Sequence, residues 1–402
     1  MFLPKAVFCR VFQTAFRLVL PVLPYRQPEI INSCQNLGDV LCKEKVQSVL
    51  IVTDAGIVKN NLTASLEKAM ADNGIAYTIY DKTQPNPTVN NVEQALKLYH
   101  SNNCGAIVTI GGGSAMDCAK AVAARVAYPN KTVGQMKGIL RVLKKTPLLV
   151  AIPTTAGTGS ETTLAAVITD SEKQDKYALM SFPLIPRYAV LDASLTYSLP
   201  PHLTSTTGMD ALTHAVEAYI GRSTTKETRQ LALEAVELVF GNIETAYTDG
   251  KNYDARQNML LAAYKAGAAF SKSYVGYVHA VAHSLGGKYG TPHGLANAVI
   301  MPYVLDAYGE KAHKKLHQLG VVAGVSLESD SHKVGAEKFI KAIRQLNENM
   351  AIPEKLSGIV KEDITQLAIH AEKESNPLYP VPVLMTAKEL EQFYYQVADW
   401  SK

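Results

Sequence analysis

The chain has 402 residues, which is too long for one ordinary hydrophobic core and therefore predicts two domains. Hydrophobic residues make up 47% and charged residues 19%, so a disordered chain is excluded and a globular protein is expected. The net charge of +4 is too small and too dispersed to indicate binding to nucleic acid. The number of cysteines is odd, and no CxxC occurs: Cys9, Cys34, Cys42, Cys104 and Cys118. We expect reduced thiols in a cytoplasmic protein rather than a disulfide framework.

Residues 1–29 are expected to form an amphipathic N-terminal extension. Four apolar residues recur at helical spacing: Phe8, Val11, Phe12 and Phe16. Arg10 and Arg17 fall on another face of this helix. No uninterrupted apolar run reaches the roughly 18 residues of a spanning helix, and no small-residue cleavage site follows. Three interpretations stay open: a helix packed on this protein or a neighbouring subunit, peripheral membrane contact, and a processed targeting segment.

The rest of the chain shows two different sequence patterns, and the boundary between them lies at Pro200–Pro201. From 30 to 200, Val/Ile/Leu-rich runs alternate with helical stretches, and they lie at 48–54, 76–81, 106–110, 148–154 and 188–192. This alternation predicts a Rossmann-like α/β domain with a parallel sheet. From 201 to 402, apolar residues recur at three- and four-residue spacing and predict an all-helical domain.

A glycine turn follows the run at 106–110 in "GGGSAMDCAKAVA" (111–123). Gly111, Gly112 and Gly113 let the backbone approach a ligand closely, and Ser114 is a suitable N-cap for the helix that follows. Such a helix start directs free N–H groups at a pyrophosphate. The GxGxxG fingerprint is absent, so a tight strand-to-helix connection is the alternative.

A second loop, "PTTAGTGSET" (153–162), also follows a strand. It offers hydroxyl groups for ribose and phosphate oxygens, from Thr154, Thr155, Thr158 and Ser160. Asp54 ends another strand, where a carboxylate can bind the adenosine ribose and repel a 2′-phosphate, which favours NAD over NADP. Asp54 precedes Gly111 by 57 residues, whereas the usual acid follows its glycine loop. The alternatives are an ordinary polar turn for the loop and a helix cap for Asp54.

Histidines gather in the predicted helical domain. Asp210 and His214 are four residues apart, as are His279 and His283, so each pair lies on one face of a helix. A carboxylate with imidazoles is typical of a divalent-metal site. The spacing does not distinguish His279 from His283 as the ligand.

His293 lies fourteen residues after His279, about 21 Å along a continuous helix and too far to share an ion. Three glycines and a proline lie between the two histidines. We therefore expect the helix to stop near Gly286 and the chain to fold back, bringing His293 beside His279.

Four segments together resemble the iron-containing (group III) alcohol dehydrogenases: "GGGSAMDCAKA", "TTAGTGSE", "GMDALTHAVEAY" and "HAVAHSLGGKYGTPHGLANAVIMP". The resemblance is greatest to the branch of lactaldehyde reductase, 1,3-propanediol dehydrogenase and short-chain alcohol dehydrogenases, and it runs from about residue 45 to the end. It implies a dehydroquinate-synthase-like architecture, NAD, Fe(II) or else Zn(II), and a homodimer or larger homo-oligomer.

The resemblance also implies a role for each matching residue. It implies four metal ligands, Asp210, His214, His279 and His293, and a nearby histidine that moves protons, His283. It places Gly111 to Ser114, Thr154, Thr155 and Thr158 at the NAD phosphates and nicotinamide ribose. Asp54 and Asn86 are expected at the adenosine ribose and cofactor groove, and Lys176 on the nicotinamide side.

The expected function is hydride transfer between a small primary alcohol or aldehyde and NAD(H), with a metal ion stabilising the alkoxide. A glycerol-dehydrogenase-like polyol oxidoreductase using zinc is the nearest alternative. A dehydroquinate-synthase-like lyase is a more distant one, because its substrate carries a carboxylate and a phosphate. The segments around the metal motifs offer mainly Lys272 and Lys288 to bind those groups. A metal-dependent hydrolase and a non-catalytic redox sensor are the remaining alternatives.

Overall fold

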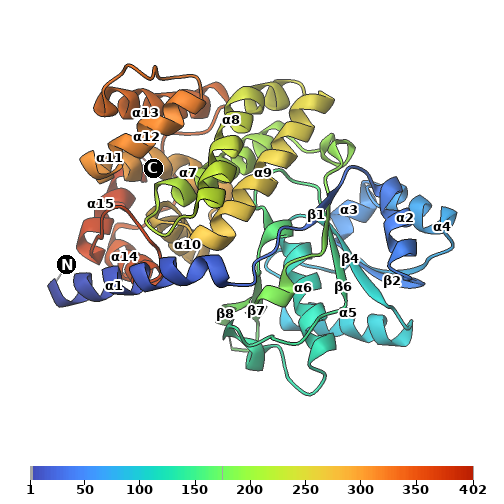
Figure 1. Cartoon of the computed structure of the whole chain (residues 1–402). Helices are drawn as coiled ribbons and strands as arrows, with labels where there is room; N and C mark the ends of the chain where they lie inside the picture. Colours follow the sequence, from blue (N-terminus) through green and yellow to red (C-terminus); the bar gives the residue numbers. More distant parts are fainter. Residues whose placement is uncertain (1–2, 174, 402) are drawn as a thin grey trace. The chain divides into compact units, whose positions relative to one another are not determined.

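The computed structural model describes residues 3–173 and 175–401, which divide into two compact units. One unit spans Pro24–Ser198 and is built on a parallel sheet. The other begins at Leu199, is helical, and also contains the N-terminal helix α1 (Leu3–Val19). The predicted fold class, an α/β part followed by an all-α part, is confirmed (Figure 1).

The main sheet of the α/β unit has the strand order β1-β9-β6-β4-β2-β3, and every neighbouring pair is parallel. Its strands are β1 (Glu29–Ile31), β2 (Ser48–Val52), β3 (Ala76–Tyr80), β4 (Ala106–Gly111), β6 (Leu148–Pro153) and β9 (Tyr188–Val190). Five of these strands fall on the apolar runs identified in the sequence. Both faces are covered by helices, which is why the strands are apolar throughout instead of alternating.

Helices cover the main sheet from two sides. They are α2 (Cys34–Lys43), α3 (Ala55–Lys59), α4 (Ala64–Asp72), α5 (Val89–Ser101) and α6 (Gly113–Ala127). Along β2, Val49 and Ile51 pack toward α2 and α4, whereas Leu50 and Val52 pack toward α5 and α6. This alternation follows from the two-residue period of a strand. Four short 3-10 helices complete the unit, at Gly134–Met136, Ser160–Thr162, Phe182–Leu184 and Ala193–Thr196.

A second, three-stranded sheet was not expected from the sequence. Its order is β5-β8-β7, with β7 and β8 antiparallel, and its strands are β5 (Gly138–Ile139), β7 (Ala165–Asp170) and β8 (Asp175–Met180). The β7–β8 hairpin follows the second predicted cofactor loop directly, and β8 holds Lys176.

Among the described residues, the helical unit contains α1 and nine α-helices after Leu199 (Figure 1). These nine are α7 (Pro201–Ile220), α8 (Lys226–Thr248), α9 (Tyr253–Ser273), α10 (Tyr277–Tyr289), α11 (His293–Tyr308), α12 (Glu310–Val322), α13 (His332–Asn349), α14 (Ile364–Ser375) and α15 (Ala387–Val397). Two 3-10 helices add to it, at Leu20–Val22 and Lys361–Asp363. Helix α7 lies at its centre and packs against α8, α9 and α11.

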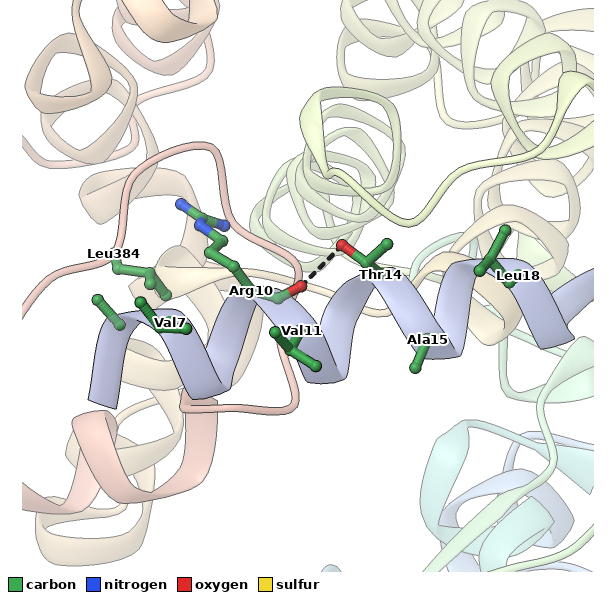
Figure 2. Close-up of a pocket in the computed structure, with 8 residues that line it drawn as sticks. Val7, Arg10, Val11, Thr14, Ala15, Leu18 and Leu384 are labelled. Atoms are coloured by element: carbon green, nitrogen blue, oxygen red, sulfur yellow. Dashed lines mark hydrogen bonds between the residues drawn. The ribbon is translucent and has the colours of Figure 1, made fainter. Parts of the chain in front are cut away.

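Helix α1 is held on this unit by polar contacts to the loop before α15. Arg10 donates to the carbonyl of Val381 at 2.7 Å, and the buried Gln13 donates to the carbonyl of Tyr379 at 2.8 Å. Val7, Val11 and Leu18 of this helix are apolar and exposed, and with Leu384 they line a shallow pocket (Figure 2). In the described ranges, no helix combines the length and the apolar character that crossing a bilayer requires.

Candidate metal centre and cofactor loops

The two predicted cofactor loops leave neighbouring parallel strands at the same edge of the main sheet. Strand β4 ends at Gly111 and β6 ends at Pro153, and these two residues pair in register. The backbone N–H of Thr154 then donates to the carbonyl of Gly111 at 3.1 Å. In an open parallel sheet, this edge is where nucleotides bind.

The glycines let the second loop approach the first one closely. Gly111 has φ +148°, a conformation that favours glycine. A Cβ atom on Gly113 would lie 3.4 Å from the Thr158 Cγ2 atom, and one on Gly112 would lie 3.8 Å from the Thr155 Oγ1 atom. The hydroxyl-bearing loop therefore packs directly against the glycine turn.

The helix after the glycine turn begins two residues earlier than it would with Ser114 as its N-cap, so that prediction was wrong. Gly112 is the N-cap of α6 and Ser114 lies inside its first turn. The Ser114 hydroxyl instead accepts from the Asn86 backbone N–H at 3.4 Å. With a glycine cap, the first N–H groups of α6 receive no side-chain oxygen from their own cap, as an anion-binding helix start requires.

Asp54, Asn86 and Lys176 lie close to this turn. One carboxylate oxygen of Asp54 caps α3 by accepting from Gly56 N at 2.8 Å, so the alternative reading as a helix cap is confirmed. The other oxygen would be 3.6 Å from a Cβ atom on Gly111, which places the same carboxylate beside the glycine turn. Lys176 donates to the Asn86 side-chain oxygen at 2.8 Å.

A buried charged cluster supports the second loop, and the sequence analysis missed it. The Lys120 ammonium on α6 donates to the Ser160 carbonyl at 2.7 Å and to the Thr163 hydroxyl at 2.8 Å. Burial lowers the pKa of Lys120 to about 8, although Asp117 and Glu161 oppose the shift. Burial also raises the pKa of Asp117 to about 6 and that of Glu161 to about 7. The available signal was polar residues recurring three apart on the otherwise apolar α6.

In the helical unit, three helices bring the four predicted ligand residues together. Asp210 and His214 lie on α7, His279 on α10, and His293 is the first residue of α11. One candidate ligand atom from each residue lies within 4.8 Å of all the others. From Asp210 Oδ1, the distance is 3.3 Å to His293 Nε2, 3.7 Å to His279 Nε2 and 3.9 Å to His214 Nδ1.

The chain folds back between His279 and His293 as expected, but at a different residue. Helix α10 continues through Gly286 and ends at Tyr289, and Gly290 follows with φ +69°. Helix α11 starts three residues later, so the ring centroids of the two histidines are 5.3 Å apart. The helix therefore passes the predicted stop near Gly286, because a glycine inside a helix costs only about 1 kcal/mol.

The donor set fits a divalent metal ion. Within the described residues, His214 Nδ1 and His279 Nε2 are buried and have no hydrogen-bond partner, a costly arrangement unless an ion takes their lone pairs. Burial lowers the pKa of His214 to about 3, which favours the neutral imidazole that binds metals. Burial also opposes charge on Asp210, but the neighbouring His214 and His293 hold the pKa of that carboxyl well below its usual range.

Two polar residues that contact the four candidate metal ligands were not identified from the sequence. Asn297, one turn after His293, donates to Asp210 Oδ1 at 2.7 Å. Glu217, one turn after His214, accepts from His279 Nδ1 at 2.6 Å. Burial lowers the pKa of His279, but the neighbouring carboxylates of Asp210 and Glu217 outweigh the effect of burial and raise the value to about 9. The spacing of Glu217 from Asp210 and His214 on one helix face was the signal available.

His283 lies beside this group and points to a different partner. Its Nδ1 atom is 2.6 Å from Glu374 Oε1 on α14, and its ring stacks on that of His293 with centroids 5.1 Å apart. The Tyr379 hydroxyl donates to the same Glu374 oxygen at 2.6 Å. His283, Glu374 and Tyr379 thus form a continuous polar chain that begins next to the four residues.

The fold and these residues define a class: a chain with a nucleotide-type α/β unit and a helical unit that contains a metal-type Asp/His group. Comparison with known proteins places it more closely. The family model for iron-containing alcohol dehydrogenase matches residues 30–193, and the model for the C-terminal part of the same family matches residues 204–398. The chain belongs to the iron-containing alcohol dehydrogenase family and is an oxidoreductase of that class.

Known relatives match this chain over most of its length. Alcohol dehydrogenase 4 of Saccharomyces cerevisiae (strain YJM789) is 41% identical over 344 residues, which are 85% of this chain and 88% of that protein. The crystal structure of a 1,3-propanediol oxidoreductase superposes with a TM-score of 0.88 at 33% identity, covering 93% of this chain and 98% of that one. Sulfoacetaldehyde reductase of Bifidobacterium kashiwanohense, in complex with NAD+, gives 0.83 at 27% identity and covers 94% and 99%.

Proposed function

We propose that this chain is an NAD-dependent alcohol dehydrogenase that transfers hydride between a small primary alcohol or aldehyde and NAD(H). We further propose that Asp210, His214, His279 and His293 hold a divalent metal ion. The observation that supports this most is the pair of buried, unpartnered imidazole nitrogens beside a buried carboxylate, in a member of this family. Fe(II) is the metal we expect, and Zn(II) is the alternative.

The chain's own residues have distinct parts in this proposal. A divalent ion supplies a Lewis acid for the oxygen of an alcohol or aldehyde. His283 exchanges the hydroxyl proton and passes it toward Glu374, with which its Nδ1 atom already pairs at 2.6 Å. Gly111 to Ser114 and Thr154, Thr155 and Thr158 hold the cofactor's phosphates and ribose, and Asp54 and Asn86 lie toward its adenosine side. Lys176 lies toward the nicotinamide.

The location, oligomeric state and membrane contact of the protein stay predictions. We expect a cytoplasmic location, a homodimer or larger homo-oligomer, and peripheral membrane contact through residues 1–29. The exposed Val7, Val11 and Leu18 support an outward contact of α1. Against an electrostatic attraction to lipid, Lys5 pairs with Glu372 at 2.5 Å and Arg10 is bound to backbone carbonyls. The hydrogen bonds of Gln13 with Tyr379 and Ser223 support the first of the three interpretations, packing on its own protein.

The test combines metal analysis with turnover. We expect the purified protein loaded with Fe(II) to retain about one ion per chain and to oxidise 1-propanol with NAD, followed at the nicotinamide absorbance. His293→Ala should lose the ion and the turnover yet still bind NADH, because the cofactor loops lie in the other unit. His283→Ala should keep the ion, turn over more slowly and show an altered pH profile.

Four results would contradict the proposal or one of its parts. One is a His293→Ala protein with full metal content, and another is a wild type that transfers no hydride from any of a panel of small alcohols. If His283→Ala loses the ion and His279→Ala keeps it, the two histidine roles are exchanged. Strong preference for glycerol over 1-propanol would indicate the polyol oxidoreductase instead.

A further inference from the structure

Glu217 contacts both the start of α10 and the ring of His279, one of the four candidate metal ligands. It is almost completely buried on α7, and both of its carboxylate oxygens are engaged by α10 and the residue before it. Oε1 accepts from the Val278 backbone N–H at 2.8 Å. Oε2 accepts from the Gly276 backbone N–H at 2.8 Å and lies 2.6 Å from His279 Nδ1.

These contacts determine how the His279 ring is presented. An ionised carboxylate only accepts hydrogen bonds, so the nitrogen facing Glu217 must be the one that bears a proton. The other nitrogen, Nε2, points at Asp210 from 3.7 Å and has no hydrogen-bond partner among the described residues. The carboxylate on one side of the ring therefore directs the opposite nitrogen toward the four-residue group.

The start of α10 is shaped to admit this carboxylate. Gly276 is the N-cap of α10, and it provides no capping side chain of its own. A Cβ atom at Gly276 would lie 2.6 Å from Glu217 Oε1 and 3.1 Å from its Cδ atom, closer than packing allows. Glu217 thus supplies the cap from a neighbouring helix and links α10 to α7, on which Asp210 and His214 lie.

We propose that Glu217 is a positioning residue for the metal centre, a role that rests on the proposed function. It holds the first turn of α10 in place and keeps the proton on His279 Nδ1, so that Nε2 is free and aimed at the ion. A carboxylate behind a ligating imidazole typically improves metal affinity about 10- to 100-fold. Neither oxygen is left over to bind the ion itself, which separates Glu217 from the four ligands.

The first test is Glu217→Gln, read as metal affinity and not as turnover. The amide matches the carboxylate in size but carries two N–H donors on one side, so it cannot accept all three hydrogen bonds. We expect the dissociation constant for Zn²⁺ or Co²⁺, measured by competition with a chelating dye, to rise about 10- to 100-fold. The visible absorption of the Co²⁺ protein should also change, because the His279 ring is no longer held.

Glu234→Gln is the matched control. Glu234 is a carboxylate of the same unit, on α8, and it pairs with Lys265 on α9. Its substitution removes the same charge without touching the contacts of His279, so Zn²⁺ affinity and the Co²⁺ absorption should stay at the wild-type values.

A second variant, Gly276→Ala, tests the same idea without removing any charge. The added methyl group should push the Glu217 carboxylate out of its place at the start of α10. We again expect weaker Zn²⁺ binding together with an altered Co²⁺ absorption. Binding of NADH, which depends on the other unit, and circular dichroism report whether each variant is folded. If Glu217→Gln does not fold, Gly276→Ala decides.

The outcomes separate this proposal from the proposed function. If wild type binds Zn²⁺, His293→Ala loses it, and both Glu217→Gln and Gly276→Ala bind it with wild-type affinity and absorption, the positioning role is wrong while the metal centre stands. If wild type binds no divalent ion more tightly than His293→Ala does, the metal centre itself is wrong and Glu217 has nothing to position.

Discussion

Glu161 is a buried carboxylate whose protonation is linked to stability. Its Oε1 atom has no hydrogen-bond partner within the described residues, and burial raises its pKa from an ordinary 4.5 to about 7. Because the folded pKa lies above the unfolded one, the stability that Glu161 contributes is fully present below about pH 4.5. It is lost as pH rises through about 7, where the folded protein must bury a charge.

We therefore expect Glu161→Gln to unfold at a higher temperature than wild type at pH 8, and to differ little from it at pH 5. The attraction between Glu161 and Lys120 works against this gain but is smaller than the effect of burial. Thermal unfolding of both proteins without ligands, at the two pH values, measures the difference. The exposed Glu172→Gln serves as control and should shift by the same small amount at both. A Glu161→Gln protein less stable than wild type at pH 8 would show that the ion pair dominates.

Asp54 is predicted to set the choice between NAD and NADP, and its contacts suggest which substitution to use. Replacement by glycine would also remove the cap of α3, whereas Asp54→Asn retains an oxygen for Gly56 N and removes only the charge. We expect the ratio of kcat/KM for NAD to that for NADP to fall about 10- to 100-fold, mainly through better use of NADP. Both cofactors must be compared at one ionic strength. An unchanged ratio would leave Asp54 as a helix cap alone.

At the scale of elements, the start of α11 depends on a close approach to α7. A Cβ atom on Gly294 would lie 2.4 Å from the Thr206 carbonyl oxygen, and a backbone atom cannot move aside as a flexible side chain can. Gly294→Ala should therefore push α11 away from α7 at the residue next to His293. We expect a loss of about 1–3 kcal/mol in unfolding free energy and a weaker metal affinity.

Gly287 offers the control for this prediction. It lies inside α10, and a Cβ atom there would meet nothing within 4 Å. Gly287→Ala should stabilise the protein by about 0.5–1 kcal/mol through helix propensity and leave metal binding unchanged. Equal effects of the two substitutions on metal affinity would show that the contact with Thr206 does not position His293.

At the scale of the whole molecule, the metal ion and the cofactor are proposed to bind to different units. The four candidate metal ligands lie in the helical unit and the cofactor loops in Pro24–Ser198. If the two units unfold separately, calorimetry should show two transitions. A ligand stabilises the unit that binds it, by about 2.7 kcal/mol at a hundred times its Kd, so each ligand should raise one transition. Zn²⁺ should raise one and NADH the other, and His293→Ala should abolish only the shift with Zn²⁺. One transition that both ligands raise equally would show that the units unfold together.

Five of the six main strands were predictable because a parallel sheet covered on both faces needs uninterrupted apolar runs. The sixth, β1, and the β7–β8 hairpin were not, since their stability comes from pairing with partners and their residues show no clear period. The glycine and threonine loops were predictable as well, because close backbone approach requires those residue types. The fold class and the family therefore followed from the sequence alone.

Tertiary structure decided the details of the site. Helical spacing makes His279 and His283 equivalent, and only the packing of α10 places His279 Nε2 beside Asp210 while His283 pairs with Glu374. The same packing outweighs the small cost of glycine at Gly286, so the helix ends at Tyr289 instead. Glu217 and Lys120 went unnoticed because a charge in a sequence does not show whether it is buried. What buries each of them, and what each then holds, depends on contacts between residues far apart in the chain.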